Sequence, residues 1–267
     1  MENVYHKRHV RFENLLHLNA AMFDQLVHVA DVQSGMRLLD VGAGYGAVTR
    51  EVLLRHPNEV LECHLLEISR TQLDQAREEL EAMATGATLH FYNRSVLAHG
   101  LPLGTYHRII AKLVWHEIPQ RDQYVLAQVL HRLLAPLGKL VLWQIALSTD
   151  LAPFYRKIIR KKDELAGFQE LASNRYFPCE SELASHIRQA GFGDLDRRVT
   201  LPYHFDSNTR LEADFGGDEF LLAQWNDFIR QEASQLTEAQ LQQLRYSDTE
   251  DSIHMLWCWG LYVAPKA

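Results

Sequence analysis

Residues 37–49 read RLLDVGAGYGAVT, a short apolar run followed by glycines at every second position. Leu38, Leu39 and Val41 are typical of a parallel strand that is buried on both faces and need not alternate polar with apolar residues. Gly42, Gly44 and Gly46 then allow a sharp turn, because glycine tolerates positive φ and its bare backbone can approach a ligand closely. A helix is predicted to follow. This arrangement is typical of nucleotide-type sites between a strand and a helix N-terminus.

Two interpretations of this turn compete. Gly42, Gly44 and Ala47 satisfy G-x-G-x-x-G/A, the dinucleotide-binding pattern of NAD-dependent oxidoreductases. The second interpretation, Asp-x-Gly-x-Gly-x-Gly, includes Asp40 at the end of the strand. A carboxylate there would repel a pyrophosphate but would suit a ligand that presents an ammonium group. Asp40 therefore favours the second interpretation, and a plain tight turn in an α/β protein is the alternative without a ligand.

The composition is that of an ordinary globular protein, with 47% hydrophobic and 23% charged residues in a chain of 267. The net charge of −7 argues against a nucleic-acid partner, which needs a clustered basic face. Three cysteines lie far apart without metal-ligand spacing, so we expect reduced thiols, no metal site and a cytoplasmic protein. The longest apolar run, residues 140–147, is too short to cross a membrane, and no signal peptide is expected.

A second acidic residue follows the glycine turn at the distance where a ribose would be bound. Residues 60–66 are predicted to form the second strand, and Glu67 closes it 21 residues after Gly46. An acidic side chain at this point can accept hydrogen bonds from both ribose hydroxyls. Glu67 therefore supports a nucleotide-binding architecture, whichever cofactor is bound.

These motifs resemble those of the class I S-adenosylmethionine-dependent methyltransferases. Asp40 with the alternating glycines is similar to the family's first motif, and LLEISRTQLDQARE at residues 65–78 resembles its second-strand motif. The resemblance covers residues 36–200 and the last strand. It implies a Rossmann-like, doubly wound α/β fold, whose seven-stranded sheet is mostly parallel with an antiparallel last strand. It also implies S-adenosylmethionine as the cofactor, although NAD enzymes share the feature at Glu67.

The same resemblance implies further cofactor contacts. Ile68 would pack against the adenine face. The family usually has an acidic residue after strand three, predicted here at 88–92, but Ser95 stands at that position and would bind adenine more weakly. Asn93 is the alternative if the register differs by two residues. The expected cofactor-binding set is Asp40, Gly42, Gly44, Gly46, Glu67, Ile68, Ser95, Val96 and Lys112.

The main candidate for a catalytic group is His116. It follows the fourth strand, predicted at 107–113, at the edge where α/β folds bind ligands, and its ordinary pKa lies near neutrality. It would act as a general base for the acceptor proton, and lining the pocket wall is the equal alternative. Weaker candidates are Glu117, Tyr203, His204 and His254.

The sequence divides the chain into three parts. Residues 1–34 are predicted to form an N-terminal helical segment, which in similar methyltransferases often folds over the cofactor. Residues 35–201 and 253–267 would form the Rossmann-like domain, and residues 202–252 a helical insertion that acts as a lid or an interface. Aromatic and basic residues near the N-terminus that would touch the cofactor or solvent are Tyr5, His6, His9 and Arg11.

Two helices are expected within the insertion, at 218–235 and 238–246, with Thr237 capping the second without a suitable partner. A helix at 154–168 precedes the insertion and carries clustered basic residues. This cluster is interpreted as a solvated face, with an anion site as the alternative. Together with the insertion, the basic helix is expected to form a lid or wall over the acceptor pocket.

Tyr203, Phe220 and Trp225 are expected to line that pocket, and a homodimer interface is the alternative use of these aromatic side chains. Such walls would suit an apolar or aromatic small molecule. The sequence therefore predicts an enzyme that transfers a methyl group from S-adenosylmethionine to an O or N atom of a small-molecule acceptor, without nucleic-acid or membrane partners. An NAD-dependent oxidoreductase and a non-catalytic methyltransferase-like binding protein are the alternatives.

Overall fold

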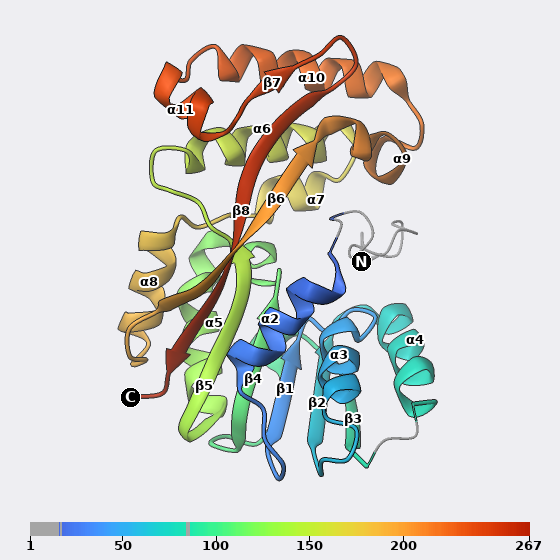
Figure 1. The fold of residues 1–267 in the computed structure, drawn as a ribbon, viewed down its shortest axis with the longest axis vertical. Coiled ribbons are helices and arrows are strands. Elements are labelled where there is room, and N and C mark those ends of the chain that lie inside the picture. Colours follow the sequence, from blue (N-terminus) through green and yellow to red (C-terminus); the bar gives the residue numbers. More distant parts are fainter. Residues whose placement is uncertain (1–15, 17, 84–85) are drawn as a thin grey trace.

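The computed structural model describes residue 16, residues 18–83 and residues 86–267 of the chain. They form a central sheet with helices on both faces and a further group of helices beyond one end of the sheet (Figure 1). The N-terminal candidates Tyr5, His6, His9 and Arg11 lie outside the described residues. None of the helices within the described ranges is long and apolar enough to cross a membrane.

The sheet has the strand order β3-β2-β1-β4-β5-β8-β6, and the two-residue strand β7 pairs with β8 outside this path. Strands β1 to β5 run parallel to one another, whereas β8 runs antiparallel to both β5 and β6. The predicted, mostly parallel α/β sheet with an antiparallel last strand is confirmed, and β7 makes it, in the described part of the chain, a sheet of eight strands where seven were predicted. The strand bounds are β1 Arg37–Val41, β2 Glu62–Glu67, β3 Thr88–Asn93, β4 Tyr106–Lys112, β5 Leu134–Ile145, β6 Asp196–Asp206, β7 Ser247–Asp248 and β8 Ile253–Pro265.

The strands from β1 to β5 present side chains to two cores, and helices cover both. Along β1, Leu38 belongs to one core and Leu39 to the other. Helices α2, α3 and α4 cover the first core, and α5 and α8 cover the second (Figure 1). The helix bounds are α2 Ala20–Ala30, α3 Ala47–Arg55, α4 Arg70–Glu81, α5 Gln120–Leu133 and α8 Glu180–Gln189.

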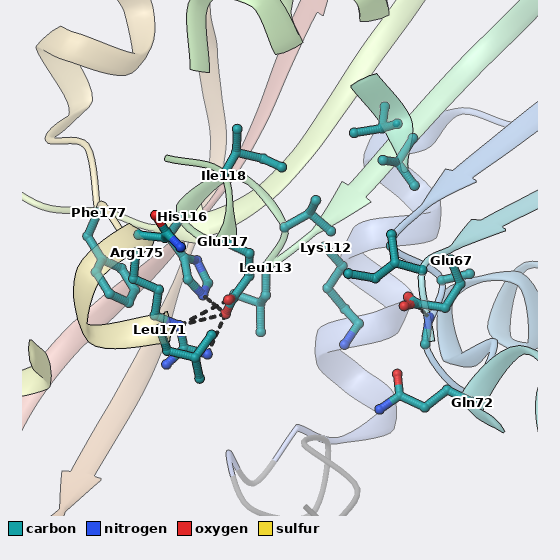
Figure 2. A pocket seen from close by; sticks show the side chains of 18 of the residues that line it. Glu67, Gln72, Lys112, Leu113, His116, Glu117, Ile118, Leu171, Arg175 and Phe177 are labelled. Atoms are coloured by element: carbon teal, nitrogen blue, oxygen red, sulfur yellow. Dashed lines mark hydrogen bonds and ion pairs between the residues drawn. The ribbon is translucent and has the colours of Figure 1, made fainter. Parts of the chain in front are cut away.

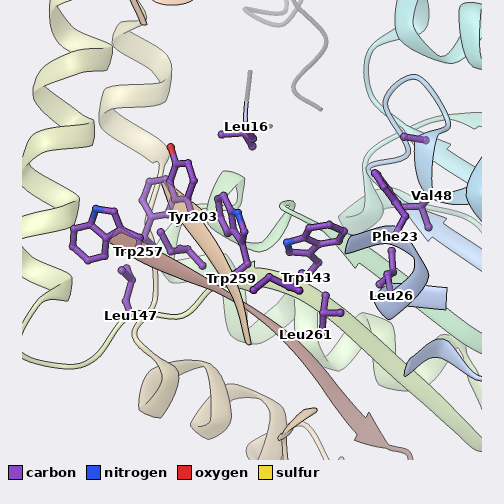
Figure 3. Close-up of a cluster of buried hydrophobic side chains, with 14 of the residues drawn as sticks. Leu16, Phe23, Leu26, Val48, Trp143, Leu147, Tyr203, Trp257, Trp259 and Leu261 are labelled. Atoms are coloured by element: carbon purple, nitrogen blue, oxygen red, sulfur yellow. The ribbon is translucent and has the colours of Figure 1, made fainter. Parts of the chain in front are cut away.

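The remaining helices form a layer that we call the roof, together with the outer parts of β6 and β8 (Figure 1). β8 pairs with β5 only from Trp259 to Pro265, so its earlier residues continue past β5 beside β6. One apolar cluster runs from the sheet into the roof, since Phe23 meets Trp143 edge-on and Tyr203 stacks on Trp259 (Figure 3). The roof helices are α6 Ala152–Leu165, α7 Gln169–Asn174, α9 Arg210–Phe215, α10 Glu219–Ala233 and α11 Glu238–Gln243.

The insertion differs in part from its prediction. β6 continues to Asp206, so the segment after residue 201 begins as a strand, while the two predicted helices are present as α10 and α11. Thr237 does not cap α11 alone. The N–H of Gln240 donates to Thr237 Oγ1 at 3.3 Å, and the N–H of Thr237 donates to Gln240 Oε1 at 2.9 Å. The expectation of an unpartnered cap was wrong because glutamine completes a capping box as glutamate does.

Helices α6 and α7 lie in the roof (Figure 1), so a domain boundary at residue 201 does not separate the sheet from the roof. The basic cluster on α6 divides between two environments. Lys157 and Arg160 have 58% and 69% of their side chains exposed and form the predicted solvated face. Lys162 instead has 4% of its side chain exposed and lies between Asp163 and Asp214. Its burial directs one positive charge of this helix inward, toward the site.

Candidate functional site

A cavity of about 650 Å³ lies between the sheet and the roof (Figure 2). His116 and Tyr203 line it together with most of the expected cofactor residues. Asp40 and Gly46 are the two expected cofactor residues that do not line it. The expected residues that do line it are Gly42, Gly44, Glu67, Ile68, Ser95, Val96 and Lys112.

The three glycines of the turn serve two purposes. Gly42 has a φ of +65°, and a Cβ built on it would collide with the Val114 side chain, so the turn leaves room for bare backbone only. The Gly44 N–H lines the cavity and donates to Glu67 Oε2 at 2.9 Å. Gly46 faces away, because a Cβ there would lie 3.0 Å from Leu80 on α4. Gly42 and Gly44 therefore form the cradle, and Gly46 allows α3 and α4 to pack closely.

Asp40 lies behind the turn and is 1% exposed. Its Oδ2 accepts hydrogen bonds from Thr49 Oγ1 at 2.8 Å and from the Thr49 N–H at 3.2 Å. The expectation that Asp40 meets a ligand ammonium directly is therefore wrong in this geometry. Instead, the carboxylate ties the first turn of α3 to the end of β1 and so fixes the shape of the glycine turn.

The burial of Asp40 makes stability depend on pH. Burial raises the pKa of Asp40 from 3.8 to about 6, against the lowering effect of its bonds to Thr49. The folded protein then keeps a proton that the unfolded chain releases, so this group lowers stability as pH rises from about 4 to about 6. In Asp40→Asn this pH dependence of stability is expected to vanish. The side-chain amide oxygen still accepts hydrogen bonds from Thr49, but the amide does not ionise.

Urea unfolding of both proteins at about pH 4 and about pH 7 measures this effect. The variant should gain stability relative to the wild type at the higher pH. An equal difference between the two proteins at both pH values would show that Asp40 titrates alike in the folded and unfolded chains.

Glu67 is held at the end of β2 with its carboxylate at the cavity. It is 7% exposed, and its oxygens accept from the Gly44 N–H at 2.9 Å and from the Ser69 N–H at 2.8 Å. Each carboxylate oxygen has a further lone pair, so both can still accept from ligand hydroxyls. This donor and acceptor pattern fits the predicted ribose contact.

The adenine position is built from short side chains. Ser95 lines the cavity, and its Oγ accepts from the Leu97 N–H at 3.3 Å as the N-cap of η2, Val96–Ala98. Asn93 does not line the cavity, because its amide donates to the carbonyls of Glu67 and Ile68 at 3.0 and 2.9 Å. Ser95 therefore matches the adenine contact better than Asn93. Ile68 is 52% exposed at the same place and offers an apolar face.

His116 lies in η3, Trp115–Glu117, and its ring stacks on Phe177 with 4.3 Å between centroids (Figure 2). His116 Nδ1 lies 2.9 Å from Nε2 and 3.3 Å from Oε1 of the Gln144 side-chain amide. Nε2 in turn lies 3.1 Å from Glu117 Oε1. Both ring nitrogens thus face protein partners rather than a bound acceptor.

Glu117 begins a chain of ion pairs that extends into the roof (Figure 2). Arg175 Nη2 lies 2.5 Å from Glu117 Oε1, and Arg175 Nη1 lies 3.1 Å from Asp163 Oδ2. Lys162 Nζ lies 2.8 Å from Asp163 and 3.1 Å from Asp214. Burial alone would raise the pKa of Glu117, but the charges and hydrogen bonds of Arg175 and His116 together outweigh burial and hold this pKa far below its usual range. Glu117 is therefore ionised at neutral pH and is a weak base.

Tyr203 is the one predicted pocket aromatic that lines the cavity. Trp225 is 0% exposed inside the roof, where its Nε1 donates to the Ile158 carbonyl at 2.7 Å. Phe220 is 70% exposed on the outside. The expected pocket roles of Trp225 and Phe220 are therefore wrong. His204 and His254, the weaker catalytic candidates, border a separate hollow beside Arg245.

Sequence reasoning missed several residues that line the roof half of the cavity. Tyr155 comes from α6, Arg175 follows α7, and Arg210 begins α9. Arg175 reaches Glu117 across 58 residues of sequence, and no local spacing rule connects them. The basic residues of α6 were the one available signal for this half of the cavity. They indicated that the helix was unusual, but not that Lys162 is the basic residue that is buried.

Comparisons with known proteins agree with this geometry. A family model described as a methyltransferase domain matches residues 38–138. Among curated proteins, the polyketide synthase-nonribosomal peptide synthetase phmA of Phaeosphaeria nodorum is 27% identical over 133 residues. That match covers 49% of this chain and 3% of the relative's own length.

Solved structures resemble the chain over most of its length. A candidate methyltransferase of Bacillus halodurans has a TM-score of 0.76 at 15% identity, covering 92% of this chain and 99% of the other. The YcgJ protein of Bacillus subtilis has a TM-score of 0.74 at 13% identity, with 93% and 99% covered.

A geranyl diphosphate C-methyltransferase of Streptomyces coelicolor, solved with S-adenosyl-L-homocysteine, has a TM-score of 0.59 at 12% identity, with 94% and 77% covered. S-adenosylhomocysteine is the demethylated form of S-adenosylmethionine, and the glycine cradle and Glu67 fit its nucleoside. Residues 38–138 therefore match a methyltransferase domain, whose methyl donor S-adenosylmethionine fits the glycine cradle and Glu67 better than NAD does, and the chain as a whole shares the fold of these solved structures.

Proposed function

We propose that the protein transfers the methyl group of S-adenosylmethionine to an O or N atom of a small acceptor bound in the roof half of the cavity. The observation that carries this proposal is the continuity of one cavity. Gly42 and Glu67 line it at the cofactor end, and Tyr155 and Tyr203 line it at the roof. Its volume of about 650 Å³ lies within the range of small-molecule sites.

The walls of the roof half support a flat or apolar acceptor. Phe177 meets Tyr155 edge-on at 5.1 Å between ring centroids, and Tyr203 stacks on Trp259 at 4.5 Å. Aromatic walls favour stacking with unsaturated rings and exclude water from the transferred methyl.

The bound cofactor supplies an electrophilic methyl group on a sulfonium sulfur. The chain then has to align the acceptor with that methyl and exclude water. Because both nitrogens of His116 are engaged and Glu117 is held as a carboxylate by Arg175, we propose that His116 orients the wall rather than removing the acceptor proton. Transfer would then act on a nucleophile that is already unprotonated.

Glu67→Ala is expected to weaken cofactor binding by about tenfold to a hundredfold, because two charge-assisted hydrogen bonds to the ribose would be lost. Calorimetric titration with S-adenosylhomocysteine measures the change. Asp74→Ala is the matched control, since Asp74 is an acid on α4 with 55% of its side chain exposed. Unchanged affinity in a folded Glu67→Ala protein would remove Glu67 from the site.

His116→Ala is expected to lower kcat by less than about tenfold, by a similar factor at about pH 6.5 and about pH 8.5, if orientation is its role. Single-turnover formation of S-adenosylhomocysteine at both pH values measures this. A general base would instead give a loss of about 10²–10⁴ that shrinks as the acceptor ionises unaided at high pH. That pattern would return His116 to the role expected from the sequence.

The overall function is tested by incubating the protein with methyl-labelled S-adenosylmethionine and pooled small metabolites, including aromatic alcohols, acids and amines. Transfer of label to one acceptor class, with equimolar S-adenosylhomocysteine, is the expected result. Tight binding of S-adenosylmethionine without turnover in any pool would favour a non-catalytic binding protein.

A further inference from the structure

Arg210 is a buried guanidinium with few partners. It is 8% exposed and lines the roof half of the cavity. To the described residues it makes one hydrogen bond, from Nη2 to the Tyr203 hydroxyl at 3.0 Å. Asp214 Oδ2 lies 3.6 Å from Nη1, which is too far for a hydrogen bond. A guanidinium has five N–H donors, so most of those of Arg210 have no acceptor within the described part of the chain.

The acid nearest to Arg210 is shared. Asp214 Oδ1 lies 3.1 Å from Lys162 Nζ, closer than the 3.6 Å between Asp214 and Arg210. Lys162 and Arg175 share Asp163 in the same way. Arg210 is thus the last member of the chain of ion pairs, and its 3.6 Å distance from Asp214 is the longest in that chain. A buried cation in this position is stabilised by a further anion with good hydrogen-bond geometry.

A second donor lies in the same part of the cavity. Tyr155 is 4% exposed, lines the cavity, and its hydroxyl has no hydrogen bond with the described residues. Burial raises the pKa of Tyr155 well above its usual value, and the charge of Arg210 acts on the same hydroxyl in the opposite direction. Both groups line the same cavity, and the hydroxyl keeps the proton that it can donate.

We propose that Arg210 and Tyr155 bind a carboxylate of the methyl acceptor, so that the acceptor is a small aromatic or apolar carboxylic acid. This inference rests on the methyl-transfer function proposed above. A carboxylate matches the planar fork of a guanidinium with two parallel hydrogen bonds and can accept a third from a hydroxyl. The aromatic rings of Phe177 and Trp259 supply the apolar surface for the rest of such a molecule.

The test uses acids and their neutral amides as probes. Benzoate, benzamide, 3-phenylpropionate and 3-phenylpropionamide are titrated by calorimetry into the full chain saturated with S-adenosylhomocysteine. At least one acid is expected to bind about tenfold more tightly than its amide, because the amide cannot form the charge-assisted pair. Equal affinities, or no binding of either acid, would overturn the inference.

Two variants show whether a preference for acids over amides depends on Arg210 and Tyr155. Arg210→Gln should lower the acid affinity by about tenfold or more and leave the amide affinity unchanged. Tyr155→Phe keeps the ring volume and should lower the acid affinity by about threefold to tenfold, which keeps the inference testable if Arg210→Gln fails to fold. Arg160→Gln is the control, since Arg160 has 69% of its side chain exposed on α6.

The readouts separate the two levels of the proposal. If the wild-type chain does not bind S-adenosylhomocysteine, the methyl-transfer function itself is contradicted. Intact S-adenosylhomocysteine binding with an acid preference that survives both Arg210→Gln and Tyr155→Phe would contradict only the carboxylate site.

Discussion

Asp163→Ala is expected to lower the free energy of unfolding by about 3–5 kcal/mol. Asp163 has 0% of its side chain exposed and pairs with Lys162 at 2.8 Å and with Arg175 at 3.1 Å. Removing this carboxylate takes a charged partner away from two buried cations. The Coulombic loss is large because water cannot reach these charges to replace the missing partner. Urea unfolding at neutral pH measures the change.

The neighbouring residue provides the control. Glu164 has 36% of its side chain exposed and pairs with Arg160 at 2.9 Å one helical turn away. Glu164→Ala is expected to cost about 0.3–0.5 kcal/mol, the usual value of an exposed pair on a helix. If Asp163→Ala lowered the free energy of unfolding as little as Glu164→Ala, the prediction would be wrong. Water would then replace the missing carboxylate as a partner of the two cations.

Trp225→Ala is expected to lower the free energy of unfolding by about 3–5 kcal/mol, chiefly through the cavity left inside the roof. The ring is 0% exposed and lies edge-on to Phe205 and Phe215 at 5.7 and 5.9 Å between centroids. Its Nε1 also donates to the Ile158 carbonyl at 2.7 Å, and this bond joins α10 to α6. Thermal and urea unfolding measure the loss, and cofactor affinity in the folded fraction should be unchanged.

Phe220→Ala is the matched control on the same helix. Its ring is 70% exposed, so truncation should change stability by no more than about 0.5 kcal/mol. A stability change at Phe220 as large as that at Trp225 would show that the outer surface of α10 is buried in solution. Such a result would restore the dimer-interface alternative for this residue.

The cofactor half of the cavity could be predicted because its signals are local. Gly42 and Gly44 act through backbone geometry that glycine alone supplies easily. Glu67 closes a strand, and parallel strands place their carboxyl ends at one edge of the sheet. The residue type and position of Asp40 were informative, but its contact was not predictable. Its side chain points to Thr49, and this orientation depends on where α3 begins.

The roof half of the cavity could not be predicted, because its residues meet only through the tertiary fold. Arg175 lies 58 residues from Glu117, and Arg210 joins the cavity through a helix with no motif. Trp225 and Phe220 lie on one helix, and the sequence alone could not show which of the two is buried. They are separated by about 140° around its axis, so only one of them can face α6. The position of α6, which the sequence does not specify locally, decides which one is buried.

The continuity of β8 has a consequence for the height of the cavity. The same strand pairs with β5 in the cofactor sheet and carries the roof beside β6, so covalent backbone sets the distance between the two. Adding two residues to both β6 and β8 would move the roof outward by about 7 Å and keep every side chain on its face. A one-residue addition would turn the following side chains to the opposite face. A change of two residues in both strands would therefore alter the height of the cavity and leave its lower end, at the glycine turn, unchanged.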